Sequence, residues 1–150
     1  MALRERLSEE MKGAMRARDT ARLGALRLML STLKDREIAL RGEAVVMTEA
    51  DELAVLAKMV KQRQESVKLF LEGKRVDLAD KEQAEIAVIE EFLPKALTGA
   101  ETEAAIAAAV AEVGAVSVRD MGRVMAVLKG RYTGQMDFGA VGGLIKARLG

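Results

Sequence analysis

The chain has 150 residues, 50% of them hydrophobic and 31% charged, and its formal net charge is +1. The absence of Cys and His excludes disulfides, thiolate nucleophiles, Cys-type zinc sites and histidine acid–base catalysis. With three Phe, one Tyr and no Trp the core must be aliphatic, and a single proline favours long helices over a β-rich fold.

Apolar residues recur at helical spacing along most of the chain, which predicts an all-α protein. Gly114 is expected to end the fifth helix, and three helices are expected to begin at a Ser or Thr cap with an acidic residue three positions later: Thr48 with Asp51, Thr98 with Glu101, and Ser117 with Asp120. Gly130 follows the apolar Leu128 by two positions and is expected to end the sixth helix as a left-handed cap, so that Lys129-Gly130-Arg131 forms a basic loop. The predicted helices are Leu3–Ala17, Arg22–Leu40, Thr48–Leu71, Lys81–Leu93, Ala100–Val113, Ser117–Lys129 and Phe138–Leu149.

Pro94 marks the expected domain boundary, because proline disfavours helical geometry at the preceding residue, Leu93. Short connections between the helices favour antiparallel neighbours. We therefore expect an N-terminal four-helix domain, residues 1–93, followed by a small three-helix C-terminal tail bundle, residues 94–150.

Positive charge concentrates near the end of the chain. Residues 1–93 carry a net charge of −1 and residues 94–116 carry −2, whereas residues 117–150 carry +4. A basic region of this kind indicates a phosphate-bearing partner. The candidate nucleic-acid contacts are Lys129 and Arg131, then Arg123 and Arg119, with Lys61 and Arg63 on the long third helix as further candidates.

These basic residues also have structural interpretations. Lys61 and Arg63 belong to a basic series that would form a solvated helix face paired with Glu65 and Glu72. Tyr132 is the one aromatic residue outside the apolar stripes, so the expected contacts are phosphates and the shape of a folded RNA, not stacked single-stranded bases.

No catalytic constellation is visible in the sequence. Glu82, Glu85 and Glu90-Glu91 lie among lysines and are interpreted as a solvated surface instead of acid–base groups or metal ligands. The phosphate-binding loop motif is absent, and we expect no cofactor and no metal. The longest apolar run, Ala104–Ala111, is far shorter than the roughly 20 residues of a membrane span, and Met1 leads directly into a charged amphipathic segment. We expect a cytoplasmic protein without a membrane partner.

Three groups of residues together resemble the signatures of the GatB/YqeY family, specifically its free-standing YqeY-like proteins. The first group is Arg22-Leu23, Leu26-Arg27-Leu28, Lys34 and Glu37-Ile38. The second is Lys61-Gln62-Arg63, Phe70, Gly73, Arg75, Asp77-Leu78-Ala79, Lys81-Glu82, Glu85 and Leu93-Pro94. The third is Asp120-Met121-Gly122, Val124-Met125 and Gly130-Arg131. In this order and spacing the resemblance covers essentially the whole chain.

The resemblance implies a relation to the helical and tail domains of the B subunit of tRNA-dependent amidotransferase, where the tail contacts tRNA. The catalytic cradle and the glutaminase of that enzyme have no counterpart here, so no amidotransferase activity is expected of the chain alone. The family usually continues with Ala-Asp after the basic pair, whereas this chain has Tyr132-Thr133, which removes an acid and adds an aromatic residue.

Three hypotheses follow. The first is a non-catalytic helper that binds tRNA or another RNA. The second is a protein-interaction module that docks on a partner protein through the same tail. The third is an accessory component of a carbon–nitrogen ligase complex that uses glutamine as amido donor. A phosphate contact weakens steeply with salt and an apolar docking surface does not, which separates the first two.

Overall fold

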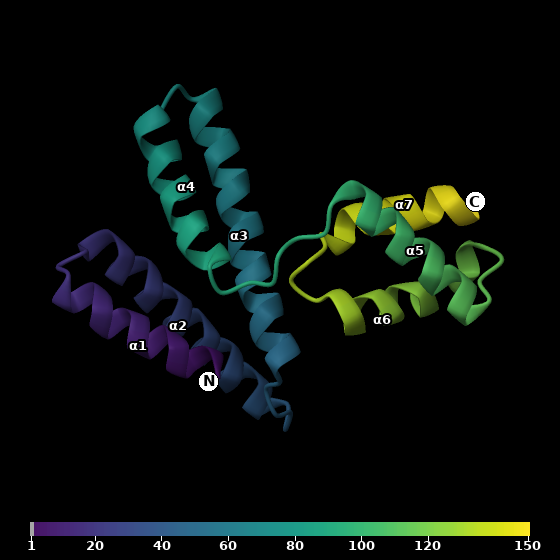
Figure 1. The fold of residues 1–150 in the computed structure, drawn as a ribbon, viewed down its shortest axis with the longest axis horizontal. Helices are drawn as coiled ribbons and strands as arrows, with labels where there is room; N and C mark the ends of the chain where they lie inside the picture. The colour runs from purple at the N-terminus through teal and green to yellow at the C-terminus, as the bar shows by residue number, and fades with distance from the viewer. Residues whose placement is uncertain (1) are drawn as a thin grey trace. The chain divides into compact units, whose positions relative to one another are not determined.

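The computed structural model describes residues 2–150, and all its regular elements over this range are helices (Figure 1). The prediction of an all-α protein is confirmed. The chain divides into two compact units, the first ending at Leu93 and the second beginning at Pro94. The helices are α1 (Leu3–Arg16), α2 (Thr20–Gly42), α3 (Glu49–Glu72), α4 (Val76–Glu90), α5 (Gly99–Val113), the short 3₁₀ helix η1 (Val118–Asp120), α6 (Met121–Tyr132) and α7 (Phe138–Leu149).

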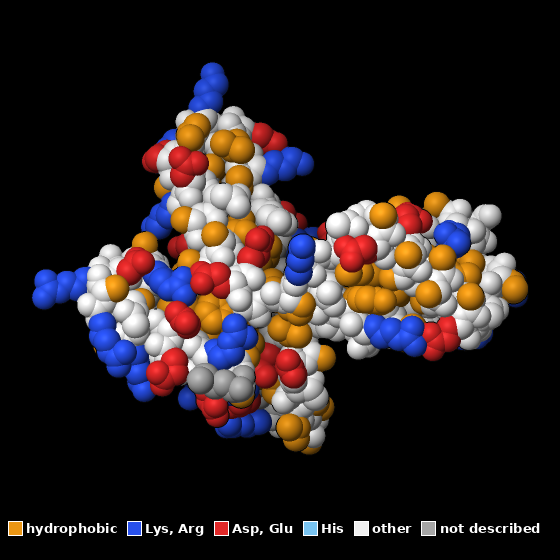
Figure 2. All heavy atoms as spheres, viewed as in Figure 1, with side chains coloured by type: hydrophobic (Ala, Val, Ile, Leu, Met, Phe, Trp, Pro, Cys, Tyr) orange, Lys and Arg blue, Asp and Glu red, His pale blue; other side chains and the backbone are white. Residues whose placement is uncertain are grey.

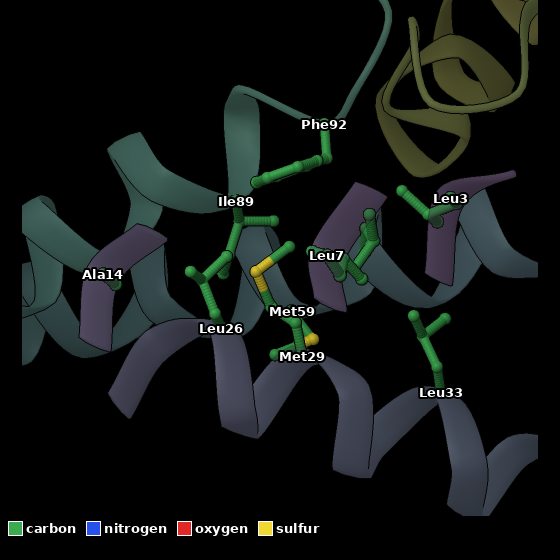
Figure 3. Packing of buried hydrophobic residues seen from close by; sticks show 10 residues of the cluster. Leu3, Leu7, Ala14, Leu26, Met29, Leu33, Met59, Ile89 and Phe92 are labelled. Atoms are coloured by element: carbon green, nitrogen blue, oxygen red, sulfur yellow. The ribbon is translucent and has the colours of Figure 1, made fainter. Parts of the chain in front are cut away.

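The first unit packs two helical hairpins, α1–α2 and α3–α4, around a core of aliphatic side chains and one aromatic residue (Figure 1). Figure 3 shows Met29 of α2 beside Met59 of α3, with Leu26 and Ile89 next to them. Each large apolar side chain that is fully buried contributes about 1.5–3 kcal/mol to the free energy of unfolding, so this core supplies most of the favourable energy of the unit. The buried members are Leu3, Leu7, Ala14, Leu26, Met29, Leu33, Leu56, Met59, Ile89 and Phe92.

Two details of the α3–α4 hairpin differ from the sequence prediction. Helix α4 begins at Val76, five residues before the predicted Lys81, because Ala79 packs inward and is buried. The apolar spacing of the third helix predicts a buried stripe made of Leu53, Leu56, Val60, Val67, Phe70 and Leu71. Leu71 is instead 52% exposed, and Met59, outside that stripe, is in the core. Within the first unit, the end of α3 nearest the α3–α4 turn has α4 beside it but neither α1 nor α2, so fewer of its faces are covered there (Figure 1).

Single arginines tie the helices of the first unit together. Arg4 of α1 pairs with Glu37 of α2 and with Glu52 of α3. Arg22 of α2 pairs with Glu91 and Glu10, and hydrogen bonds to these carboxylates raise the pKa of the Arg22 guanidinium. Each arginine therefore joins chain segments that the hydrophobic core has already brought together.

The second unit is built from α5, α6 and α7. Thr98 and Glu101 form a capping box that begins α5, as the sequence predicts, and Gly114 ends it in the left-handed conformation (φ 65°). The core is again aliphatic, with partly buried Tyr132, Met136 and Phe138 packed against it. Its buried members are Ala105, Ile106, Ala109, Val124, Leu128, Val141 and Ile145.

The sixth helix does not end where the sequence suggests. Gly130 is inside α6, which continues to Tyr132, and the left-handed glycine is Gly134 (φ 82°). Tyr132 packs against the core of the unit, so the last turn gains buried area by remaining helical. The prediction of a basic loop at Lys129-Gly130-Arg131 is therefore wrong: these residues form the last turn of a helix.

Candidate nucleic-acid interface

The capping box of Ser117 and Asp120, predicted to begin the sixth helix, begins the 3₁₀ helix η1 instead, and α6 follows directly at Met121. Asp120 accepts hydrogen bonds from the backbone N–H groups of Val116 (2.9 Å) and Ser117 (3.3 Å), and the Ser117 hydroxyl accepts from the N–H of Arg119 (3.3 Å). The bonds from Val116 and Ser117 lower the pKa of Asp120, because they favour the charged carboxylate. The short 3₁₀ helix η1 therefore lies between this cap and the first residue of α6.

Lys129 and Arg131 leave α6 in different directions because both are helical. Residues two positions apart on an α-helix are separated by about 200° around the helix axis, so these two side chains point to nearly opposite sides. The structure therefore separates the two residues that a loop would have brought together.

Lys129 is exposed in the last turn of α6, and it makes no ion pair with any residue that the structure describes. Its backbone carbonyl accepts a hydrogen bond from the Thr133 hydroxyl, which helps to close the end of the helix. Its ammonium group is therefore available to an external anion.

Arg131 contacts Glu112 of α5, with 2.7 Å between guanidinium and carboxylate. Both side chains are about half exposed, and a pair of this kind is worth only about 0.2–1 kcal/mol. A phosphate can therefore compete with Glu112 for Arg131. Glu112 lies 19 residues earlier in the chain, and no sequence pattern indicated this contact.

Arg119 and Arg123 lie at the opposite end of α6 from Lys129. Arg123 donates to the backbone carbonyl of Val113, the last residue of α5, and also contacts Asp120 (3.4 Å). It satisfies a carbonyl that has no partner within α5, so its first role is to join α5 to α6. Arg119 is exposed on η1 and makes no ion pair with any described residue.

The two candidates on α3 belong to the first unit. Lys61 is exposed, but Arg63 is only 14% exposed and lies between Glu82 and Glu85 of α4, with 3.0 Å to the nearer Glu82 oxygen. These glutamates are ion-pair partners and not the freely solvated surface that the sequence suggested. Arg63 joins α3 to α4, and this geometry gives no support to a phosphate contact.

Along α6 and the turn after it, the charge is of one sign. Residues 121–136 include Arg123, Lys129 and Arg131 and no acidic residue. Within residues 2–150 there is no group of three or more Asp or Glu side chains that could hold a metal ion. Nor, in the same range, is any helix long and apolar enough to cross a membrane.

The comparison with protein families decides the relationship. A family model described as Yqey-like protein matches residues 4–149. The chain belongs to the Yqey-like protein family. The family resemblance inferred from the three signatures is thereby confirmed.

Curated relatives of this family member come from yeasts. The "Altered inheritance of mitochondria protein 41, mitochondrial" of Saccharomyces cerevisiae (strain YJM789) is 39% identical over 90 residues, 58% of this chain and 46% of the relative. The protein of the same name from Lachancea thermotolerans is 33% identical over 100 residues, 65% of this chain and 51% of the relative. The chain thus spans about half the length of the curated relatives it matches.

The names of these relatives place them in mitochondria and contradict the cytoplasmic location expected from the sequence. That expectation is withdrawn. It rested on composition and on the charged N-terminal segment, and neither property distinguishes the two compartments, because a helical domain needs the same apolar core and charged surface in both.

Proposed function

We propose that this Yqey-like protein is a non-catalytic helper that binds RNA, tRNA in the first instance, through the α6 surface of its second unit. The observation that carries the proposal is that Lys129 is exposed and makes no ion pair within residues 2–150, on a segment with three basic and no acidic residues. Electrostatic contact with phosphates supplies most of the affinity of sequence-independent nucleic-acid binding.

The four candidate residues of the second unit, out of its seven basic residues, have different parts in this proposal. Lys129 binds a phosphate as a point charge. Arg131 binds one after it leaves Glu112, and its planar guanidinium suits two parallel hydrogen bonds to phosphate oxygens. Arg119 extends the surface at the other end of α6, about 15 Å from Lys129 at the rise of a helix. Arg123 positions α6 and contributes charge, and Arg63 has no part.

The proposal is tested by equilibrium binding of total tRNA to the purified 150-residue chain over a series of salt concentrations. Lys129→Glu should weaken binding and lower the slope of log K against log salt by about 1. Lys58→Glu, an exposed lysine on α3, is the matched control and should leave both quantities unchanged. No binding at low salt, or equal binding by Lys129→Glu and the parent protein, would refute the proposal.

Glu112 allows a test in the opposite direction. Glu112→Gln removes the intramolecular competitor of Arg131 and should tighten tRNA binding by about twofold to fivefold, the range expected for a half-exposed ion pair. The double variant Glu112→Gln/Arg131→Gln should lose this gain. A gain in affinity is a useful result because a damaged fold cannot produce it.

A second candidate function, protein docking, is favoured by one observation. Val116, between α5 and η1, is 85% exposed, and Val118 of η1 is also exposed. Exposed apolar side chains that lie close together indicate protein contact. If the chain binds a partner protein through these valines, that binding should not weaken with salt. Val116→Asp should abolish it and leave tRNA binding unchanged.

A further inference from the structure

The most basic segment of the first unit is the α1–α2 turn together with the helix ends on either side of it, residues 12–27. Residues 12–27 carry five basic residues and one acidic residue, a net charge of +4, although residues 1–93 together have a net charge of −1. The basic residues are Lys12, Arg16, Arg18, Arg22 and Arg27, and the acidic one is Asp19. This local excess equals that of residues 117–150, in half the length of chain.

Internal contacts divide these residues into two sets. Lys12 pairs with Glu9 (3.3 Å), and Arg22 pairs with Glu10 and Glu91. Asp19 accepts the backbone N–H of Arg22 (3.1 Å) as the cap of α2. The second set, Arg16, Arg18 and Arg27, is exposed, and none of the three makes an ion pair with a residue that the structure describes.

The three unpaired arginines come from both helices and from the turn between them. Arg16 is the last residue of α1, Arg18 is in the turn, and Arg27 is about 10 Å along α2 from its first residue. Figure 2 shows Lys and Arg side chains projecting from the α1–α2 turn, at the left of the view. Unpaired guanidinium groups are therefore exposed to solvent at the end of α1, in the turn and in the first part of α2.

We propose that this α1–α2 turn is a second phosphate-binding surface, which contacts the backbone of the same RNA that the α6 surface binds. The inference rests on the proposed function. Guanidinium groups match the oxygens of a phosphate bidentately, and all three unpaired side chains are arginines. Two weak surfaces in one chain raise the affinity for a single RNA, because binding of the first makes the second contact intramolecular.

The packing of α1 and α2 favours a phosphate backbone over an anionic membrane as the partner. A helix that binds a membrane surface needs a continuous apolar face turned toward the lipid. The apolar faces of α1 and α2 are in the core instead, where Leu7 and Leu26 are fully buried. The exposed apolar side chains nearby, Met15 and Leu28, lie on different helices.

The turn also allows a variant that separates binding from folding. Arg18 is in the left-handed conformation (φ 57°), which is strained for any residue with a Cβ atom. Arg18→Gly relieves this strain and removes the charge. Lys74, at the α3–α4 turn, has the same backbone conformation (φ 58°) and is exposed. Lys68→Gln/Lys74→Gly is therefore a matched control for Arg16→Gln/Arg18→Gly, with the same loss of charge and the same relief of strain.

The experiment measures tRNA binding by the 150-residue chain and its variants over a series of salt concentrations, together with their melting temperatures. Arg16→Gln/Arg18→Gly should bind about tenfold more weakly at 0.1 M salt, with a salt slope lower by about 2 and an unchanged or higher melting temperature. The Lys68→Gln/Lys74→Gly control should bind as the parent does. Equal binding by both double variants would overturn the inference.

The results also distinguish this inference from the proposed function. If Lys129→Glu weakens tRNA binding and Arg16→Gln/Arg18→Gly does not, the α6 surface stands and the second surface is refuted. If only the arginine variant weakens binding, the α1–α2 turn is the RNA contact and the proposal for α6 fails. If Arg16→Gln/Arg18→Gly loses binding to phosphatidylglycerol vesicles that the parent protein binds, and still binds tRNA as the parent does, the inference is overturned in favour of a membrane contact.

Discussion

The ion pairs of Arg63 provide the sharpest test of what stabilises the α3–α4 hairpin. Arg63 is 14% exposed and contacts Glu82 and Glu85, which lie on adjacent turns of α4 and are each less than a quarter exposed. Arg63→Met keeps the apolar length of the side chain but removes the charge. Two partly buried carboxylates then face each other without a cation.

The expected cost follows from these contacts. A hydrogen bond to a charged group contributes about 1.5–3 kcal/mol when buried, and partial exposure reduces this value. We expect Arg63→Met to lower the free energy of unfolding by about 2 kcal/mol. For a unit of this size that corresponds to a decrease in melting temperature of about 10 °C. Urea and thermal unfolding, followed by circular dichroism at 222 nm, measure both quantities.

The carboxylates supply the control for this prediction. The triple variant Arg63→Met/Glu82→Gln/Glu85→Gln removes the two uncompensated charges and should recover at least half of the lost stability. A loss below about 0.5 kcal/mol in Arg63→Met, or a triple variant no more stable than the single one, would refute the reasoning. Binding of tRNA by Arg63→Met should equal that of the parent, because Arg63 is engaged within the first unit.

Four further predictions concern local structure. Ala44→Gly, at a left-handed position (φ 58°) after α2, should raise stability by about 0.5–1 kcal/mol in urea unfolding, and a loss would show that strain there is negligible. Thr98→Ala should cost about 1 kcal/mol by removing the cap of α5, whereas Thr98→Ser should retain most of it. The pKa of Asp120 is lowered in the folded protein, so the unfolded chain takes up a proton there first as the pH falls. The free energy of unfolding should therefore decrease below about pH 5. Asp120→Asn should make melting temperature depend less on pH, which a series of melting curves at different pH values measures. A fragment of residues 94–150 should be helical and melt cooperatively by itself, and an unfolded fragment would contradict the proposal of separate domains.

Local interactions explain why several caps were predictable. A capping box depends on residues three positions apart, and the boxes at Thr48, Thr98 and Ser117 lie where the sequence places them. The left-handed end of α5 at Gly114 was also predictable. The prediction that the sixth helix ends at Gly130 was wrong because Tyr132 packs against the core and keeps the last turn helical.

The candidate site was predicted as a set of residue types and not as an arrangement. The excess of positive charge in residues 117–150 is a property of composition and was visible at once. The engagement of Arg63 by Glu82 and Glu85, and of Arg131 by Glu112, depends on which helices are neighbours. The α1–α2 turn was overlooked because acidic residues elsewhere in the first 93 cancel its charge in the sum.

The sequence by itself determined the helical class, the aliphatic core, most helix boundaries and membership of the Yqey-like family, because these depend on periodicity, composition and motifs within a few turns of chain. Only the tertiary structure decided which cations face solvent. An arginine makes an ion pair or remains available according to the helix that packs beside it, and that neighbour comes from a distant part of the chain. Arg63 and Arg16, both on helices and equal in charge, differ for this reason alone.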